Sequence, residues 1–218
     1  MSEVQQFHSP KKLVNPSQVR SVDVAVVGGG IAGKACALGL AQLGLTTAEI
    51  APDLGSPTPA PQGSQWEQRI YAFSPSTQKL LAHLQIWDAL DHSRLQVVRD
   101  MRIYGDRGER NDQLHLSAFE AGTSQLAWIG ESNLIEHTLD QASRFQNKLE
   151  RINDAVEKIE VNTQGSTLHL KNGEVVHAQL VVAADGANSP IRSAIGITAS
   201  EESYLQTAVV ANWICTYP

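Results

Sequence analysis

The sequence contains few residues of the kinds that mark secreted or metal-binding proteins. Only two of its 218 residues are cysteines, Cys36 and Cys215, and we expect both to be small buried thiols rather than a disulfide or a redox pair. The seven histidines are scattered along the chain. None of them stands with Cys, Asp or Glu at the spacing of a metal site, so we expect no bound metal.

Long apolar runs are also missing, and this bears on where the protein works. No stretch is long enough to cross a bilayer as a helix. Residues 1–20 are polar and lack the apolar core of a signal peptide. We therefore expect a cytoplasmic protein whose first 20 residues form a flexible tail. Peripheral contact of the protein with the inner membrane is an alternative.

A basic excess, the usual mark of a nucleic-acid binder, is absent. The chain carries 17 Lys and Arg against 23 Asp and Glu, a net charge of -6, so we expect no nucleic-acid partner. Hydrophobic residues make up 42% of the chain, which is typical of a packed globular protein. The length suits one domain, or one domain and part of another.

Residues 21–51 predict a strand, a turn, a helix and a second strand. Residues 21–27 are almost continuously apolar, as in a parallel strand that is buried on both faces. Residues 31–44 follow as a helix that ends at Gly44, and residues 45–51 form the next strand. We therefore expect an α/β fold with a Rossmann-like domain, in which the crossover between the two strands is right-handed.

Further elements follow this unit. Ser74 predicts the start of a helix whose apolar residues recur at helical spacing as far as Leu90. Strand patterns between residues 97 and 130 suggest a sheet separate from the first, and residues 131–143 predict another helix. From Ala155 the chain has the pattern of a β-meander, with a tight Asn-Gly turn in its second half.

The turn after the first strand carries the glycines of a dinucleotide-binding site. Gly28, Gly30 and Gly33 fit the pattern G-x-G-x-x-G, with Ile31 and Ala32 between the last two. The first glycine allows a tight turn, the second lets a pyrophosphate approach the backbone, and the third lets helix and strand pack closely. Backbone N–H groups at the start of the helix would bind the phosphates. A turn used only for packing is the alternative.

The acidic residue that usually accepts the ribose hydroxyls is not at its expected place. It should end the second strand, but that strand ends at Ala51. Glu49, two residues earlier, points to the same face, and Asp53 follows in the loop. Glu49 is the preferred candidate, although its charge would be costly in a central strand unless it is paired. Asp53, a water molecule or a backbone group are the alternatives.

Three later segments narrow the choice of nucleotide. They are EQRIYAFSPSTQKLLAHLQIWDAL (67–90), LAWIGESNLIEHTL (126–139) and LVVAADGANSPIR (180–192). With the glycine turn, and in this order, they resemble the single-component FAD-dependent aromatic hydroxylases. Within that group the chain is most similar to the ubiquinone-biosynthesis hydroxylases, which include the 2-octaprenyl-6-methoxyphenol hydroxylases. The resemblance extends from about Val22 to Pro218.

The resemblance implies a set of residues that bind FAD. The three glycines match the pyrophosphate turn. Arg69 matches an arginine near the flavin and its phosphates, with a surface arginine as the alternative. Glu131 falls at the start of a helix that lines the flavin, although Asn133 stands where the family often has an arginine. Val156 falls where a backbone segment packs against the adenine.

The last segment carries the most specific part of the resemblance. Asp185 and Gly186 match an Asp-Gly motif, and Ser189 and Arg192 follow at the family's spacing. In the family this motif touches both FAD and the incoming NAD(P)H. An acid at the carboxyl end of a buried strand is also where ligands bind in open α/β sheets. An ordinary Asp-Gly turn is the alternative.

By resemblance, the chain divides into alternating parts of two domains. A β-rich substrate domain would interrupt the FAD-binding domain and return at the end of the chain, where its first returning strand is expected. A later Gly-Asp motif of the family is absent, so we expect an N-terminal fragment that binds FAD weakly or not at all by itself. The expected parts are a tail (1–20), the FAD-binding domain (21–95 and 131–200) and the substrate domain (96–130 and 201–218).

The resemblance also implies an activity. NAD(P)H would reduce FAD, O₂ would add to give a C4a-hydroperoxide, and the aromatic ring of a polyprenyl quinone precursor would be hydroxylated. The flavin would carry this chemistry without a catalytic side chain. The alternatives are another FAD-dependent oxidoreductase, an NAD(P)-dependent dehydrogenase, and a non-catalytic partner of other ubiquinone-biosynthesis proteins.

Overall fold

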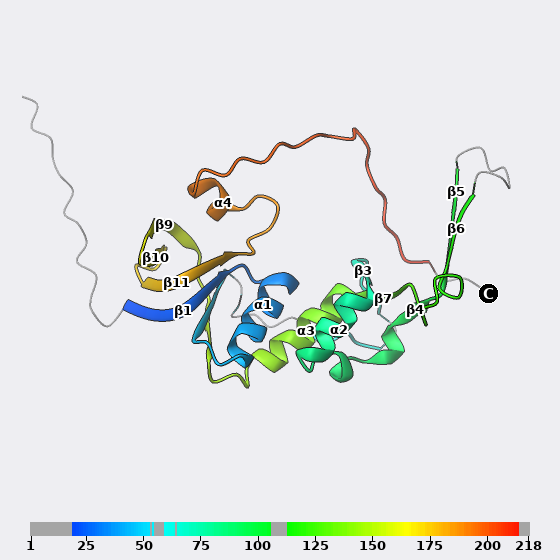
Figure 1. Ribbon diagram of the computed structural model, residues 1–218, viewed down its shortest axis with the longest axis horizontal. Coiled ribbons are helices and arrows are strands. Elements are labelled where there is room, and N and C mark those ends of the chain that lie inside the picture. The colour runs from blue at the N-terminus through cyan, green and yellow to red at the C-terminus, as the bar shows by residue number, and fades with distance from the viewer. Residues whose placement is uncertain (1–18, 53, 55–58, 64, 106–112, 214–218) are drawn as a thin grey trace, which may run out of the picture.

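The computed structural model describes residues 19–52, 54, 59–63, 65–105 and 113–213. A six-stranded sheet lies beside a group of three helices, and an extended segment runs from α4 (Pro190–Ala194) toward the side of a protruding hairpin (Figure 1). The first strand begins at Val19, two residues before its predicted start. The rest of the predicted tail, residues 1–18, lies outside the described residues.

The six-stranded sheet has four parallel strands and an antiparallel meander at one edge. Its order is β8-β2-β1-β11-β10-β9. The first three pairs along this order are parallel and the last two are antiparallel. This confirms the predicted α/β fold. The strands are β1 (Val19–Val27), β2 (Thr47–Ile50), β8 (Leu149–Ile152), β9 (Val156–Asn162), β10 (Gly165–Leu170) and β11 (Val175–Ala183).

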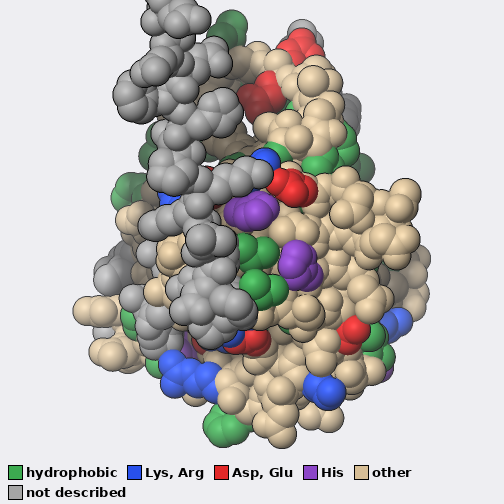
Figure 2. Space-filling model, turned by 90° about the vertical axis from the view of Figure 1, so that its left-hand side faces the viewer, with side chains coloured by type: hydrophobic (Ala, Val, Ile, Leu, Met, Phe, Trp, Pro, Cys, Tyr) green, Lys and Arg blue, Asp and Glu red, His purple; other side chains and the backbone are tan. Residues whose placement is uncertain are grey.

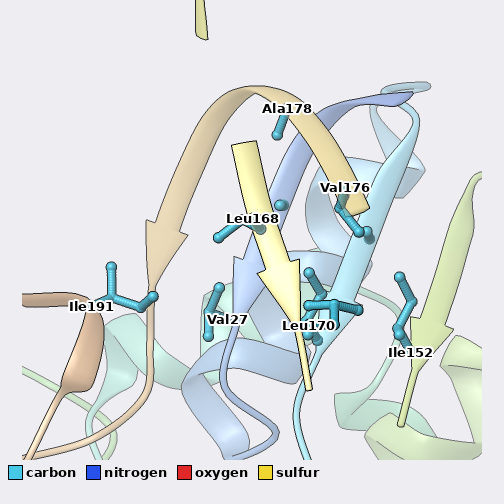
Figure 3. Close-up of a cluster of buried hydrophobic side chains, with 10 residues drawn as sticks. Val27, Ile152, Leu168, Leu170, Val176, Ala178 and Ile191 are labelled. Atoms are coloured by element: carbon cyan, nitrogen blue, oxygen red, sulfur yellow. The ribbon is translucent and has the colours of Figure 1, made fainter. Parts of the chain in front are cut away.

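Both faces of β1 are buried, which explains its continuous apolar sequence. Val24 and Val26 pack on one face against helix α1 (Ile31–Gln42). On the other face Ala25 and Val27 join a cluster that includes residues from the meander and Ile191 of α4, as Figure 3 shows. Successive side chains of a strand point to opposite faces, so β1 contributes to two cores at once.

The three longer helices share a core of their own. Leu38 of α1 packs with residues from α2 (Pro75–His83) and α3 (Ser132–Ser143). Ser74 caps α2 by accepting a hydrogen bond from Thr77 N at 3.2 Å, which confirms the predicted helix start. The helix ends much earlier than Leu90, because Gln85 has a φ of 61°. Two short 3₁₀ helices follow, η2 (Trp87–Ala89) and η3 (His92–Arg94).

The middle of the chain forms two small sheets, where the sequence predicts one sheet separate from the first. One has the order β3-β7-β4, and the other is an antiparallel hairpin of β5 and β6. The hairpin protrudes from the body of the molecule (Figure 1). The strands are β3 (Ile70–Phe73), β4 (Gln96–Val98), β5 (Asp100–Tyr104), β6 (Gln113–Ser117) and β7 (Ala127–Glu131).

The end of the described chain differs from the prediction in two respects. Helix α4 was not anticipated from the sequence. The returning strand predicted for residues 207–218 is wrong for its described part, residues 207–213, which is exposed and forms no strand. A strand needs a hydrogen-bonded neighbour, and none of the described strands pairs with this segment. The remaining residues, 214–218, lie outside the described part, and so does Cys215. Cys36 is free and half-buried.

The surface at the meander end is mixed in character. Figure 2 shows histidine and hydrophobic side chains there, with acidic and basic side chains around them. In the part of the chain that the structure describes, no helix has both the length and the apolar composition needed to cross a membrane.

Candidate functional site

A cleft of about 640 Å³ opens at the carboxyl ends of the parallel strands. Its walls come from the glycine turn, the end of β2, the connection between β8 and β9, helix α3 and the segment after β11. Ligands of open α/β sheets bind at this edge. The cleft therefore lies where the sequence places the nucleotide.

The pairing of β1 with β11 brings the two most specific motifs together. The strands are parallel, and Val27 lies opposite Ala183 in their register. The chain leaves both strands at the same edge, where Ala184 N donates to Val27 O at 2.7 Å. The glycine turn and the Asp-Gly segment, about 155 residues apart in sequence, therefore form adjacent walls of one cleft.

The three glycines of the turn differ in their surroundings. Gly28 has a φ of 132°, and a Cβ there would lie 2.1 Å from the carbonyl oxygen of Ala184. A Cβ on Gly33 would lie 1.9 Å from the carbonyl oxygen of Gly28. A Cβ on Gly30 would meet nothing within 4 Å, because this residue faces the open cleft. Two glycines thus allow close packing, and the third leaves room for a ligand.

The start of α1 is suited to bind an anion. Gly30 is its N-cap, no side chain caps it, and its first turn contains no acidic residue. The first N–H groups of a helix lack intrahelical partners and carry partial positive charge. Ile31 and Ala32 begin the helix, while their side chains line a different groove beside α2. Their contribution to a phosphate site would come from the backbone.

Val156, Asp185 and Gly186 all line the cleft. Gly186 has a φ of 87°, which favours glycine. The Asp185 carboxylate accepts hydrogen bonds from Ser189 Oγ at 2.5 Å and Ile191 N at 3.0 Å. The acid therefore fixes the start of α4 beside the cleft, and its segment supplies a wall.

A chain of buried charges lies against the cleft. Arg151 of β8 donates to Glu49 Oε2 at 2.7 Å and to Asp140 Oδ1 at 2.7 Å. Asp140 Oδ2 accepts from Lys34 Nζ at 3.1 Å. Lys34, Asp140 and Arg151 line the cleft, whereas Glu49 does not. Glu49, the preferred candidate for binding the ribose, thus lies behind the wall of the cleft. It is paired with Arg151, as a buried charge must be.

Burial governs the electrostatics of Glu49. Its side chain is fully buried, and its Oε1 has no hydrogen-bond partner. This burial raises the pKa of Glu49, although the positive charge of Arg151 opposes the shift. The alternative acid, Asp53, lies outside the described residues.

Two further predicted residues lie away from the cleft. Arg69 is exposed, and its guanidinium lies 5.4 Å from the centre of the Tyr71 ring. Glu131 is buried and paired with Arg94, with 2.6 Å between Glu131 Oε2 and Arg94 Nε. Burial alone would raise the pKa of Glu131, but hydrogen bonds from Arg94 and from Glu67 N lower it overall. Neither residue lines the cleft.

Sequence reasoning missed the charged wall of the cleft. Lys34 was the available signal, because it is the only charged residue in α1 and a buried lysine requires a partner. Glu136 and Asp140 stand one turn apart on α3, so they share a helix face. Arg151 gave no comparable signal, because β8 is short and was not predicted.

The fold and the cleft together define a dinucleotide-binding domain of the Rossmann type. Comparison with known families gives the particular family. A family model described as "FAD binding domain" matches residues 21–216, and the chain belongs to this family. The open space at Gly30 and the uncapped start of α1 fit the pyrophosphate of FAD.

The chain is also similar to individual proteins with assigned functions. It is 32% identical to the 3-demethoxyubiquinol 3-hydroxylase of Escherichia coli, over 88% of this chain and 48% of that protein. It is 27% identical to the mitochondrial ubiquinone biosynthesis monooxygenase of Caenorhabditis elegans, over 87% of this chain and 43% of that protein. The chain thus spans about half the length of these relatives.

Solved structures show the same fold. The p-nitrophenol 4-monooxygenase of Pseudomonas putida superposes with a TM-score of 0.63 at 23% identity, over 81% of this chain and 44% of that one. At this identity the likeness concerns the fold.

Proposed function

We propose that this chain forms the FAD-binding part of a monooxygenase that hydroxylates the aromatic ring of a polyprenylated quinone precursor, with NAD(P)H as the reductant. The observation that carries the proposal is the contact between the glycine turn and the Asp-Gly segment at one sheet edge. Family membership and the names of the two relatives above support the same conclusion. When bound, FAD would supply the redox chemistry.

Each wall of the cleft has a role in this proposal. The backbone at Gly28, Gly30 and the start of α1 would bind the pyrophosphate, and Val156 would lie beside the adenine. Gly186 would let the chain pass close to the flavin side of the nucleotide. Arg69 lies outside the cleft lining, so a phosphate contact from its guanidinium requires movement of the segment before β3.

Glu131 has a supporting role in the proposal. Its partner Arg94 also donates to Gly63 O at 3.0 Å and Gln65 O at 2.7 Å. The pair therefore anchors the segment that precedes Arg69. In this way Glu131 would order the part of the chain that approaches the flavin, without touching it.

The proposed partners follow from the proposed substrate. A polyprenylated phenol is a lipid, so the enzyme would take it from the surface of the inner membrane as a peripheral protein. Other ubiquinone-biosynthesis proteins are the expected neighbours. A non-catalytic member of such a complex is the second candidate.

A binding experiment and an activity assay test the proposal. We expect calorimetric titration of the chain to show weak binding of FAD and weaker binding of NAD⁺ or NADP⁺. NAD(P)⁺ binding without FAD binding, together with flavin-free oxidation of an alcohol, would instead indicate a dehydrogenase. Oxygen uptake with NAD(P)H, FAD and a polyprenyl phenol should then be measured. FAD binding without turnover, but with stable capture of other ubiquinone-biosynthesis enzymes, would favour the non-catalytic role.

A further inference from the structure

Among the described residues, the usual acceptor for the ribose hydroxyls is missing from the cleft. Ala51, which directly follows β2, stands where an acid is expected, and Glu49 is fully buried and does not line the cleft. A dinucleotide with its pyrophosphate at Gly30 and its adenine at Val156 would place the adenosine ribose between them. Ribose hydroxyls donate hydrogen bonds to an acid in such sites. Among the described residues, a carboxylate acceptor would then come from another wall.

Four carboxylates line the cleft among the described residues, and in three of them both oxygens accept hydrogen bonds from the protein. Asp154 accepts hydrogen bonds from two backbone N–H groups. Asp185 accepts from a hydroxyl and a backbone N–H. Asp140 binds one cation with each of its oxygens. These three carboxylates hold the walls in place.

The fourth carboxylate, Glu136 on α3, differs from the others. Its Oε1 accepts a hydrogen bond from Ser132 Oγ at 2.8 Å. Its Oε2 lies 3.9 Å from Lys34 Nζ, which is beyond hydrogen-bond distance. The side chain is 24% exposed. Because a carboxylate has about four lone-pair positions, Glu136 keeps acceptor capacity at the cleft surface.

The neighbouring charges hold Glu136 in position. Asp140 lies one turn further along α3, on the same face, and its ion pairs with Lys34 and Arg151 tie α3 to α1 and β8. The Lys34 ammonium lies close to both Asp140 and Glu136. The ribose acceptor would therefore be preorganised, which lowers the cost of binding.

We propose that Glu136 accepts the hydroxyl groups of the adenosine ribose of FAD and replaces the acid that is missing at Ala51. The inference rests on the proposed function, since it assigns one further contact within the same cleft. A carboxylate that accepts from hydroxyl groups forms charge-assisted hydrogen bonds, which are stronger than neutral ones. Glu136 is thereby a residue that selects for an unmodified ribose.

The test uses ADP as the adenosine and pyrophosphate part of FAD. ADP, 2′-deoxy-ADP and 3′-deoxy-ADP are titrated into the unaltered chain and into Glu136→Gln, which keeps an acceptor for Ser132. We expect the dissociation constant for ADP to rise about 10- to 100-fold in the variant. At least one deoxy analogue should bind the unaltered chain correspondingly more weakly than ADP. In the variant, ADP and that analogue should bind alike.

The control is Glu157→Gln, which makes the same charge change at an exposed residue of β9 outside the cleft lining. It should leave all three dissociation constants unchanged, and circular dichroism should show that both variants are folded. The inference is overturned if Glu136→Gln binds ADP as tightly as the unaltered chain does, or if it still binds ADP more tightly than the deoxy analogue. Either result would leave the FAD site standing. If the unaltered chain bound neither ADP nor FAD, the inference and the proposed function would fail together.

Discussion

Gly28 shows how a single residue can join two distant parts of the chain. Its φ of 132° is unfavourable for residues with a side chain, and the Ala184 carbonyl occupies the space where a Cβ would lie. The glycine is therefore required both by the turn and by the contact with the Asp-Gly segment.

Gly28→Ala should destabilise the fold. Backbone strain and the clash with Ala184 should together lower the free energy of unfolding by more than about 2 kcal/mol, as measured by urea denaturation. Gly44→Ala is a matched control, because Gly44 also has a positive φ but its Cβ would meet no atom within 4 Å. Its cost should be strain alone, about 1 kcal/mol. Equal losses in both variants would contradict the assigned contact.

Gly30→Ala should separate binding from folding. A Cβ at Gly30 meets nothing in the protein, so the free energy of unfolding should change by no more than about 0.5 kcal/mol. The methyl group would occupy the space of the pyrophosphate, which must approach the backbone at this glycine. The affinity for FAD or ADP, measured by calorimetry, should therefore fall at least tenfold. Unchanged affinity would place the phosphates elsewhere.

At the scale of elements, the Arg94–Glu131 pair connects η3, β7 and the segment before β3. Both side chains are buried. Removing one partner of a buried ion pair leaves the other charge uncompensated, which is far more costly than losing an exposed pair.

Glu131→Gln should therefore lower the free energy of unfolding by about 3 kcal/mol at pH 7. The pKa of Glu131 is lowered in the folded protein, so its stabilising contribution is present above the unfolded value and is lost as the pH falls through the folded value. The difference between the variant and the unaltered chain should shrink below about pH 4.5. Denaturation curves at pH 7 and pH 4 measure this. A difference that grows in acid would refute the ion-pair account.

The elements themselves were predictable to different degrees. The first strand, α1 and the meander have strong local patterns, since each is either continuously apolar or marked by glycine. Strand β8 is only four residues long and two of them are charged, so no local pattern distinguished it. The helix after Ser74 was predicted too long, because the apolar spacing continues past Gln85 while the backbone does not.

At the scale of the whole molecule, ligand binding should be coupled to stability. The cleft is built from short segments that are far apart in the sequence, between Val27 and Ile191, so a ligand that bridges them binds the folded state and stabilises it. None of the described residues that line the cleft belongs to the two small sheets, and the hairpin of β5 and β6 protrudes (Figure 1).

FAD at about 100 times its dissociation constant should raise the free energy of unfolding by about 2.7 kcal/mol. For a chain of this size, that corresponds to a rise of about 5–10 °C in the midpoint of thermal unfolding. Calorimetry or circular dichroism measures the shift, with NAD⁺ at the same concentration as the comparison. A larger shift with NAD⁺ than with FAD would argue against the FAD site.

The sequence by itself determined the α/β class, the glycine turn, the Asp-Gly segment and the family. These features are local, because each depends on residues adjacent in the chain and on their backbone preferences. Only the tertiary structure decided that Glu49 is buried against Arg151 and that Lys34, Glu136 and Asp140 line the cleft. Those contacts join α1, α3, β2 and β8, and they depend on strand order and helix packing, which no local pattern encodes.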